Sequence, residues 1–349
     1  MVSNPFLGVT LHAIGGLAAG SFYIPFKGVR GWAWESYWLA GGIMSWIVAP
    51  WVVAAFTTPD LFAVLAGAPK ESLFWTYVFG LLWGVGGLTF GLSMRYLGIS
   101  LGYAIALGFC AAMGTLIPPL FTGELSGMLT ASSGRVVIGG VAVCVLGIAV
   151  CGHAGIRKER ELPESGKTAV IAEFNFVRGV WVAVFAGVMS ACMSFGINAG
   201  KPIAALAVEH GTAHLWQNTP VFIVILAGGF TTNFVWCVYL NRKNKTGGDY
   251  LRRDTPLLPN YLFSALAGLT WYLQFMFYGM GTTQMGRYDF ASWTLHMAFI
   301  IVFSNIWALA LREWRGCSKR TTAWIFAGLL VLFLSTLVIG YGNKLAGTG

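Results

Sequence analysis

The stretch Trp38–Phe56, WLAGGIMSWIVAPWVVAAF, decides the fold class because it contains no Asp, Glu, Lys or Arg. A helix of roughly 20 apolar residues crosses the hydrocarbon of a bilayer, where each backbone N–H and C=O must find its partner inside the segment. Residues 6–24 and 323–339 form similar blocks. None of these blocks alternates apolar and polar residues, which argues against a transmembrane β-barrel. The sequence therefore predicts an all-α integral membrane protein.

The composition of the 349-residue chain supports this prediction. Hydrophobic residues make up 56% of the chain and charged residues only 10%, whereas a soluble domain carries about 25% charged residues. A net charge of +9 in a soluble protein would raise the question of nucleic-acid binding, but here the basic residues lie in short stretches between apolar blocks. We therefore expect the lipid bilayer, and no nucleic acid, as a partner.

Ten membrane-spanning helices are predicted from the apolar blocks. They lie near residues 6–24, 36–56, 73–95, 99–121, 135–155, 178–199, 219–240, 260–281, 288–311 and 322–342. A very short link around Gly98 joins the third and fourth helices. Loops after the odd-numbered helices hold 17 of the 22 Lys and Arg residues, and the other loops and the tail hold five. By the positive-inside rule the odd-numbered loops face the cytoplasm, so both termini are predicted to be periplasmic.

An internal repeat is indicated by two segments of the same pattern. Gly80-Leu81-Leu82-Trp83 in the third helix corresponds to Gly268-Leu269-Thr270-Trp271 in the eighth, and Ser21-Phe22 corresponds to Ser194-Phe195. This predicts two five-helix repeats, at 1–156 and 178–349, joined by a cytoplasmic loop at 157–177. Because five is odd, the two repeats have opposite orientations, which is the architecture of transporters that alternate access to a central site.

Sugar-binding candidates lie on the faces of two predicted helices, the eighth and the sixth. Trp271, Gln274 and Tyr278 share one face of the eighth helix, where a ring covers the apolar face of a sugar and an amide bonds its hydroxyls. The alternative is helix packing with one satisfied Gln. In the sixth helix Ser194 and Asn198 share a polar stripe, whose alternative role is bonding to helix carbonyls or to a neighbouring helix. Further candidates are Trp83, Tyr23 and Trp293.

Proton-coupling candidates are the ionisable residues inside the apolar blocks, because such residues are costly in lipid. Asp289 and His296 are placed on one face of the ninth helix, so the carboxylate would lie near a buried imidazole. The alternative is that Asp289 caps the helix in water. His12 on the first helix is a third candidate, with packing as its alternative. Glu35 is a fourth, although an ion pair with Lys27 or Arg30 is the preferred interpretation.

Several other classes of chemistry lack their motifs. The sequence contains no P-loop, no HExxH motif, no GxSxG motif and no metal-spaced Cys/His cluster, which disfavours ATP-driven pumping and the usual hydrolases. The six cysteines form no CxxC pair and are expected to be small packing residues. We therefore expect a protein that is not an enzyme and that needs no metal and no cofactor beyond a coupling proton.

A family resemblance rests on motifs distributed along the whole chain. These motifs are His12 with Ser21-Phe22-Tyr23-Ile24-Pro25-Phe26-Lys27, Trp32-Ala33-Trp34-Glu35, Trp83-Gly84-Val85-Gly86, Ser93-Met94-Arg95-Tyr96-Leu97-Gly98, Met193-Ser194-Phe195 with Asn198, Lys201 and Pro202, Trp271-Tyr272-Leu273-Gln274-Phe275, Tyr288-Asp289 and Ser292-Trp293-Thr294-Leu295-His296-Met297. Together they resemble the bacterial L-rhamnose–proton symporter family, within the drug/metabolite transporter superfamily.

The resemblance implies a ten-helix inverted-repeat fold in the bacterial inner membrane and uptake of L-rhamnose with protons. L-lyxose and L-mannose are further candidate substrates. Three rival functions stay open at the level of sequence. They are a metabolite exporter of the same superfamily, a membrane-embedded enzyme acting on lipid-linked sugars, and a sensor or scaffold. Neighbouring sugar-catabolic genes would favour uptake over export, and an enzyme would need a catalytic cluster at one membrane face.

Overall fold

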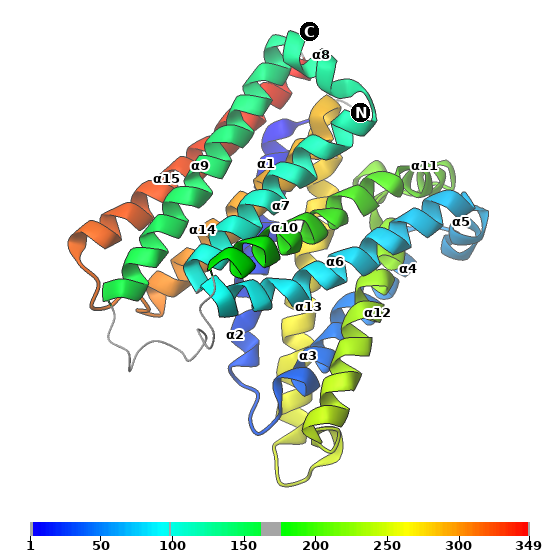
Figure 1. The fold of residues 1–349 in the computed structure, drawn as a ribbon. Helices are drawn as coiled ribbons and strands as arrows, with labels where there is room; N and C mark the ends of the chain where they lie inside the picture. The colour runs from blue at the N-terminus through cyan, green and yellow to red at the C-terminus, as the bar shows by residue number, and fades with distance from the viewer. Residues whose placement is uncertain (1–2, 98, 162–175, 348–349) are drawn as a thin grey trace. The chain divides into compact units, whose positions relative to one another are not determined.

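The structure is a computed structural model that describes residues 3–97, 99–161 and 176–347. Within these ranges every regular element is helical and no strand occurs, which confirms the predicted fold class. Figure 1 shows long helices joined by shorter helical and irregular segments. The predicted link at Gly98, and residues 162–175 of the predicted connecting loop with Lys167, lie outside the described residues.

Among the residues that the structure describes, ten long helical segments occur where the apolar blocks predict them. Eight are single helices, namely α1 (Pro5–Ser21), α6 (Lys70–Leu97), α7 (Ile99–Phe121), α9 (Ser132–Glu161), α10 (Phe176–Ala199), α12 (Thr219–Asn244), α13 (Leu257–Thr282) and α15 (Lys319–Gly347). The other two are composite: α3 (Trp34–Gly42), a π turn η1 (Ile43–Val48) and α4 (Ala49–Thr57) form one, and a 3-10 turn η5 (Gly286–Ala291) with α14 (Ser292–Ala310) forms the other. The single-turn α2 (Tyr23–Phe26) follows α1.

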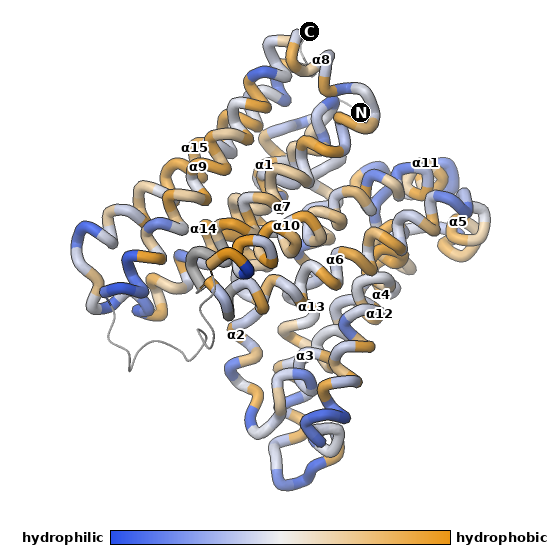
Figure 2. Tube along the Cα trace, viewed as in Figure 1, coloured by the Kyte–Doolittle hydropathy of each residue, from blue (hydrophilic) through white to orange (hydrophobic). Residues whose placement is uncertain are grey.

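These segments are long enough to cross a membrane. Among the described residues, nine helices meet the requirements of both length and apolar composition. The remaining long segment, α13, has 26 residues, about 39 Å at the α-helical rise, which exceeds the roughly 30 Å of bilayer hydrocarbon. In Figure 2 hydrophilic residues gather at helix ends and connections, while the long helices are largely hydrophobic between them. The chain is thus a multi-pass membrane protein.

Three short helices occupy segments for which the sequence predicts only loops. They are α5 (Leu61–Gly67), α8 (Glu124–Thr130) and α11 (Lys201–Glu209). α11 begins with Pro202 in its first turn, where the missing N–H of proline is not needed. The part of the chain that the structure describes also contains the 3-10 turns η3 (His214–Trp216) and η4 (Asp249–Leu251).

The chain divides into two compact units that do not coincide with the predicted repeats. Unit 1 comprises Met1–Leu17, Gly86–Ser194 and Gly281–Gly349, and unit 2 comprises Ala18–Val85 and Phe195–Met280. The division falls inside α1, α6, α10 and α13, so each of these helices contributes to both units. The units describe packing, whereas a repeat describes symmetry along the chain, so the inverted repeat stays a prediction.

In unit 1, α9 and α15 pack closely along their lengths because glycines remove side chains from their interface. A Cβ added to Gly140 on α9 would lie 2.6 Å from Ile339 Cγ1 of α15, and one added to Gly328 on α15 would lie 2.6 Å from Cys151 Sγ of α9. Small residues of this kind allow close helix approach in lipid. Val137, Val141 and other buried apolar side chains then form a core with η5 and α14.

In unit 2, two helix crossings also depend on glycine. A Cβ on Gly80 of α6 would meet the carbonyl of Ile225 on α12, and a Cβ on Gly268 of α13 would meet the carbonyl of Gly41 on α3. The π turn η1 lies one residue beyond Gly42 and contains the buried Trp46. Pro50 follows in α4, and its missing N–H removes one i→i−4 hydrogen bond, which permits the wider turn.

Candidate functional site

An aromatic cluster, formed by Phe22, Trp38, Trp46, Trp83, Trp271 and Phe275, lies inside unit 2 and contains two of the predicted sugar-binding residues. Trp271 is its centre. The ring centroid of Trp271 lies 3.9 Å from that of Phe22, 5.4 Å from that of Trp38 and 6.2 Å from that of Trp46, each at a steep interplanar angle. Trp83 reaches Trp46 at 6.2 Å and Phe275 at 5.6 Å. Edge-to-face packing of this kind is favourable between aromatic rings.

The aromatic cluster contains buried polar atoms that lack hydrogen-bond partners. Among the described residues, the indole N–H groups of Trp271 and Trp46 and the hydroxyl of the adjacent Ser45 have no partner in the protein. Leaving a buried polar group without a hydrogen-bond partner costs about 1–3 kcal/mol of stability. Such groups are therefore rare in native structures and usually have a structural or functional role. A polar ligand that reached this cluster would meet two indole donors and a hydroxyl.

The space beside these groups is small as the rings now stand. The cavity bounded by Phe22, Trp38, Trp46 and Trp271 measures about 10 Å³, close to the minimum for one water molecule. A monosaccharide therefore binds there only if the rings move apart. Tyr23 lies at the edge of the aromatic cluster, where it is 54% exposed and stacks on Trp38 at 6.3 Å.

The remaining predicted sugar-binding residues are divided between the two units. Gln274 and Tyr278 are buried on α13 within unit 2, and the half-buried Asn198 lies near the end of α10 in the same unit. Ser194 belongs to unit 1, where its Oγ donates to the Gly114 carbonyl at 2.7 Å. Trp293 also belongs to unit 1, and its indole N–H donates to the Cys110 carbonyl at 3.1 Å. Ser194 and Trp293 thus join helices of unit 1 to α7.

Two buried histidines face each other in unit 1. The side chains of His12 on α1 and His296 on α14 are 0% and 1% exposed, and their ring centroids lie 6.5 Å apart. Gly281 makes room for the His12 ring, because a Cβ there would lie 2.8 Å from His12 Cε1. The face of a single helix gives no sign of this pairing, because it joins residues that are 284 positions apart in the chain.

Asp289 does not lie in the α-helix that carries His296. It belongs to η5, and α14 begins only at Ser292. Tyr288, directly before Asp289, has the non-helical angles φ −107° and ψ 49°, so the expected continuous helix from residue 288 is wrong. Asp289 is half-buried, whereas Trp293 and His296 are almost completely buried. Of the two proton-coupling candidates expected on this helix face, His296 lies in α14 and Asp289 does not.

Glu35 takes part in a buried polar network at one end of unit 2. Its Oε1 accepts hydrogen bonds from Asn244 Nδ2 at 3.0 Å and Thr246 Oγ1 at 2.7 Å, so the expected ion pair with Lys27 or Arg30 is replaced by neutral donors. Asp249, which the sequence marks only as a loop acid, is 4% exposed and accepts from Ser36 Oγ and the Ala33 N–H, each at 2.8 Å.

The neighbouring Tyr250 closes this network. Its hydroxyl accepts from Asn241 Nδ2 at 3.1 Å, and burial raises the pKa of the Tyr250 hydroxyl above its ordinary value. The network thus joins the start of α3 to the connection between α12 and α13. Among the described residues, no group of three His, Cys, Asp or Glu side chains is arranged to hold a metal ion.

Comparison with known proteins decides the family. Residues 1–345 match the family model described as L-rhamnose-proton symport protein. The chain belongs to this family. It is 38% identical to a protein of Cronobacter sakazakii and 37% identical to proteins of Citrobacter koseri and Yersinia pestis, each named L-rhamnose-proton symporter. Each alignment covers 340 residues, 96% of this chain and 97% of the relative. The predicted resemblance to the L-rhamnose–proton symporter family is confirmed, and the chain is a transporter rather than an enzyme.

Proposed function

We propose that this chain takes up L-rhamnose together with protons across the bacterial inner membrane. The observation that carries the proposal is the match to the symporter family over residues 1–345. L-lyxose and L-mannose are further candidate substrates. In this proposal the proton is the coupling ion and the chain uses no cofactor. Both termini lie in the periplasm, as the distribution of basic residues predicts.

The aromatic cluster of unit 2 is proposed to recognise the sugar. Its indole faces suit the C–H face of a pyranose ring, and the indole N–H groups of Trp271 and Trp46 suit its hydroxyls. Gln274 and Tyr278 lie on α13 with Trp271 and supply further polar groups. Because the cavity now measures about 10 Å³, sugar binding requires that some of the rings separate. This requirement is compatible with a site that opens and closes during transport.

The imidazole pair of His12 and His296 is proposed to carry the proton. Imidazole is the side chain whose unperturbed protonation changes between about pH 5 and 8, and intramembrane ionisable groups commonly form proton relays. The burial of both rings and their 6.5 Å separation favour them over the half-buried Asp289 of η5. Glu35, which accepts two hydrogen bonds at one end of unit 2, is proposed to hold that end together.

Two helices connect the proposed proton and sugar residues covalently. α1 carries His12 and ends at Ser21, the residue before Phe22, and α13 carries both Trp271 and Gly281, the glycine that contacts the His12 ring. Because both helices contribute residues to unit 1 and to unit 2, we propose that protonation of the imidazole pair influences the aromatic cluster through them. This is the physical basis that we propose for coupling.

An alternating-access mechanism in the drug/metabolite transporter superfamily is supported by the two glycine crossings of unit 2. Gly80 occupies the third predicted helix and packs on the seventh, and Gly268 occupies the eighth and packs on the second. If the second five helices repeat the first, these two crossings are equivalent. The inverted repeat would thus place the same contact at two sites of opposite orientation.

Uptake of labelled L-rhamnose by proteoliposomes, with and without an inward proton gradient, tests the proposed function. We expect accumulation that a protonophore abolishes and that L-lyxose inhibits more than D-glucose does. A folded protein that shows no uptake in any gradient would contradict the proposal and favour another substrate or export.

A further inference from the structure

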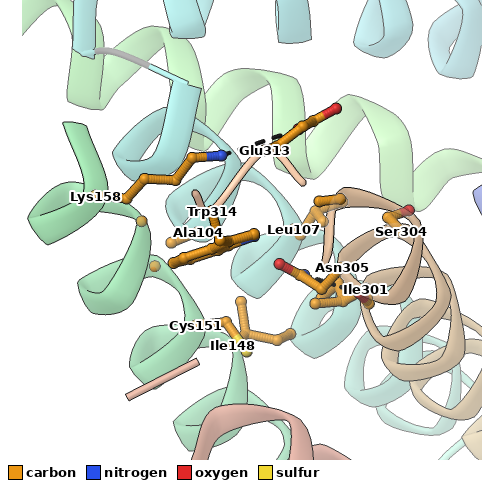
Figure 3. A pocket seen from close by; sticks show the side chains of 13 residues that line it. Ala104, Leu107, Ile148, Cys151, Lys158, Ile301, Ser304, Asn305, Glu313 and Trp314 are labelled. Carbon is orange, nitrogen blue, oxygen red and sulfur yellow. Dashed lines mark hydrogen bonds and ion pairs between the residues drawn. The ribbon is translucent and has the colours of Figure 1, made fainter. Parts of the chain in front are cut away.

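A second cavity, with a largely apolar wall and a few polar groups, lies within unit 1, and none of the proposed proton or sugar residues lines it. It measures about 260 Å³ and is bounded by α7, α9, α14 and the turn that follows α14. Figure 3 shows Trp314 at its centre, with Lys158 and Glu313 above, Asn305 beside it, and Cys151 and Ile148 below. The cavity lies at the ends of α9 and α14 that carry the predicted cytoplasmic loops.

The cavity presents a buried hydrogen-bond donor that has no partner in the protein. Trp314 is 9% exposed, and among the described residues its indole N–H has no acceptor. The ring packs against Ala154 and Ile325, which fixes its position. Asn305 uses its Nδ2 to donate to the Ile301 carbonyl at 2.9 Å, so the Oδ1 of its amide remains as the acceptor.

The charges of the lining balance. Lys158 Nζ lies 3.9 Å from Glu313 Oε2 and 4.8 Å from the centroid of the Trp314 ring, and these two are the only charged side chains that line the cavity within the described part of the chain. A lining with one positive and one negative group has no net preference for an anion or a cation. Both groups still bond neutral hydroxyls strongly.

The volume of the cavity and the chemistry of its walls further restrict the class of ligand that fits. Pockets for drug-sized ligands commonly measure about 300–1,000 Å³, so this cavity suits a smaller molecule and leaves little room for an acyl chain. Leu107, Ile148 and Ile301 supply an apolar wall opposite the polar groups. A neutral monosaccharide with one apolar edge, such as a 6-deoxy sugar, matches both surfaces.

We infer that this cavity is a second sugar-binding subsite, which the transported sugar occupies on the cytoplasmic side before its release. The inference rests on the proposed function, because it assigns the same substrate to a second place along the path. The indole N–H of Trp314 donates to a sugar hydroxyl, the Asn305 amide accepts from another, and the Lys158–Glu313 pair binds the ring hydroxyls at the open end.

The test compares transport from the two faces of the membrane. Trp314→Phe removes the N–H and keeps the ring packing, and Leu107→Phe reduces the cavity volume. In everted membrane vesicles, which present the cytoplasmic face, Trp314→Phe is expected to raise the half-saturating L-rhamnose concentration by about 5-fold, the value of one hydrogen bond. Leu107→Phe is expected to raise it as well, because the larger side chain occupies space that the sugar needs. In right-side-out vesicles the change is expected to stay below about 2-fold. Trp324→Phe is the matched control, because this tryptophan of α15 packs beside His153 of α9 and does not line the cavity.

Three results would overturn the inference. They are unchanged kinetics of both variants on both faces, equal changes on both faces, and changes confined to right-side-out vesicles. Failure of the proposed function is distinguishable, since the unsubstituted protein would then transport no L-rhamnose in either vesicle type. Normal transport with insensitive variants would reject the second subsite alone.

Discussion

Replacing either buried imidazole with an amide of similar size, as His12→Gln or His296→Gln, is expected to abolish accumulation of sugar against its gradient. Glutamine fills much of the same space but cannot take a proton in the physiological range. Exchange of labelled for unlabelled L-rhamnose across the membrane should persist, because exchange needs no net proton movement. The matched control is His153→Gln, which alters an exposed histidine on α9 beside Trp324.

The separation of the two rings sets how many protons the pair carries. Two positive charges 6.5 Å apart repel by about 2.5 kcal/mol at an effective dielectric constant near 20, so a second proton binds on the order of 70-fold more weakly than the first. The pair should therefore transfer one proton per sugar. A membrane potential of about 100 mV then adds about 2.3 kcal/mol per cycle, which is about 50-fold accumulation, whereas two protons would give about 2,500-fold.

Proteoliposomes with a clamped membrane potential and no pH gradient measure this ratio directly. The steady-state ratio of internal to external L-rhamnose should change about 50-fold per 100 mV in the unsubstituted protein. A slope corresponding to two charges would refute the argument from the ring separation. Normal accumulation by both single variants, with exchange intact, would refute the assignment of the proton to this pair and return Asp289 to consideration.

Three further substitutions test separate parts of the structure. Trp271→Phe should raise the half-saturating L-rhamnose concentration for uptake about 5-fold through loss of one hydrogen bond, whereas Trp236→Phe on the exposed side of α12 should not; equal effects would argue against the aromatic cluster as the site. Glu35→Gln should lower the free energy of unfolding in detergent by about 2 kcal/mol, because the charge-assisted hydrogen bonds from Asn244 and Thr246 weaken. An unchanged midpoint of the unfolding transition would contradict this prediction. Gly80→Ala should lower the free energy of unfolding by about 1–3 kcal/mol, because its Cβ would meet a backbone carbonyl. Gly91→Ala on the same helix meets nothing within 4 Å and should raise that free energy by up to about 1 kcal/mol. An unfolding midpoint higher for Gly80→Ala than for Gly91→Ala would argue against the close crossing at Gly80.

The long helices could be predicted from the sequence because hydropathy reports directly on contact with lipid. Their ends could not. The predicted helix 135–155 extends in the structure as α9 from Ser132 to Glu161, because a helix continues past the hydrocarbon wherever its backbone bonds persist. The short helices α5, α8 and α11 were also outside the reach of hydropathy, since segments of seven to nine residues carry no membrane signal.

The candidate site could be predicted only one helix at a time. The sequence singles out Trp83 and Trp271 as candidates, but it offers no signal that Trp38 and Trp46 pack with them rather than at a lipid interface. The same limit applies to His12 and His296, and to the burial of Asp249. Each of these contacts joins residues separated by long stretches of chain, and a single sequence does not show which faces of different helices meet.

The π turn η1 has a consequence for chain length. Its wider winding accommodates one residue more than an α-helix of the same rise, so Ile43–Val48 behaves as a fixed insertion inside the second membrane-spanning segment. Deleting one residue there would let the segment wind as a regular α-helix, while the residues before and after the turn keep their faces. Trp51 and Val52 would therefore still face outward, as they do now. A one-residue gap between this chain and its relatives is therefore expected to be tolerated at Ile43–Val48, whereas a gap elsewhere in the same segment would rotate the helix.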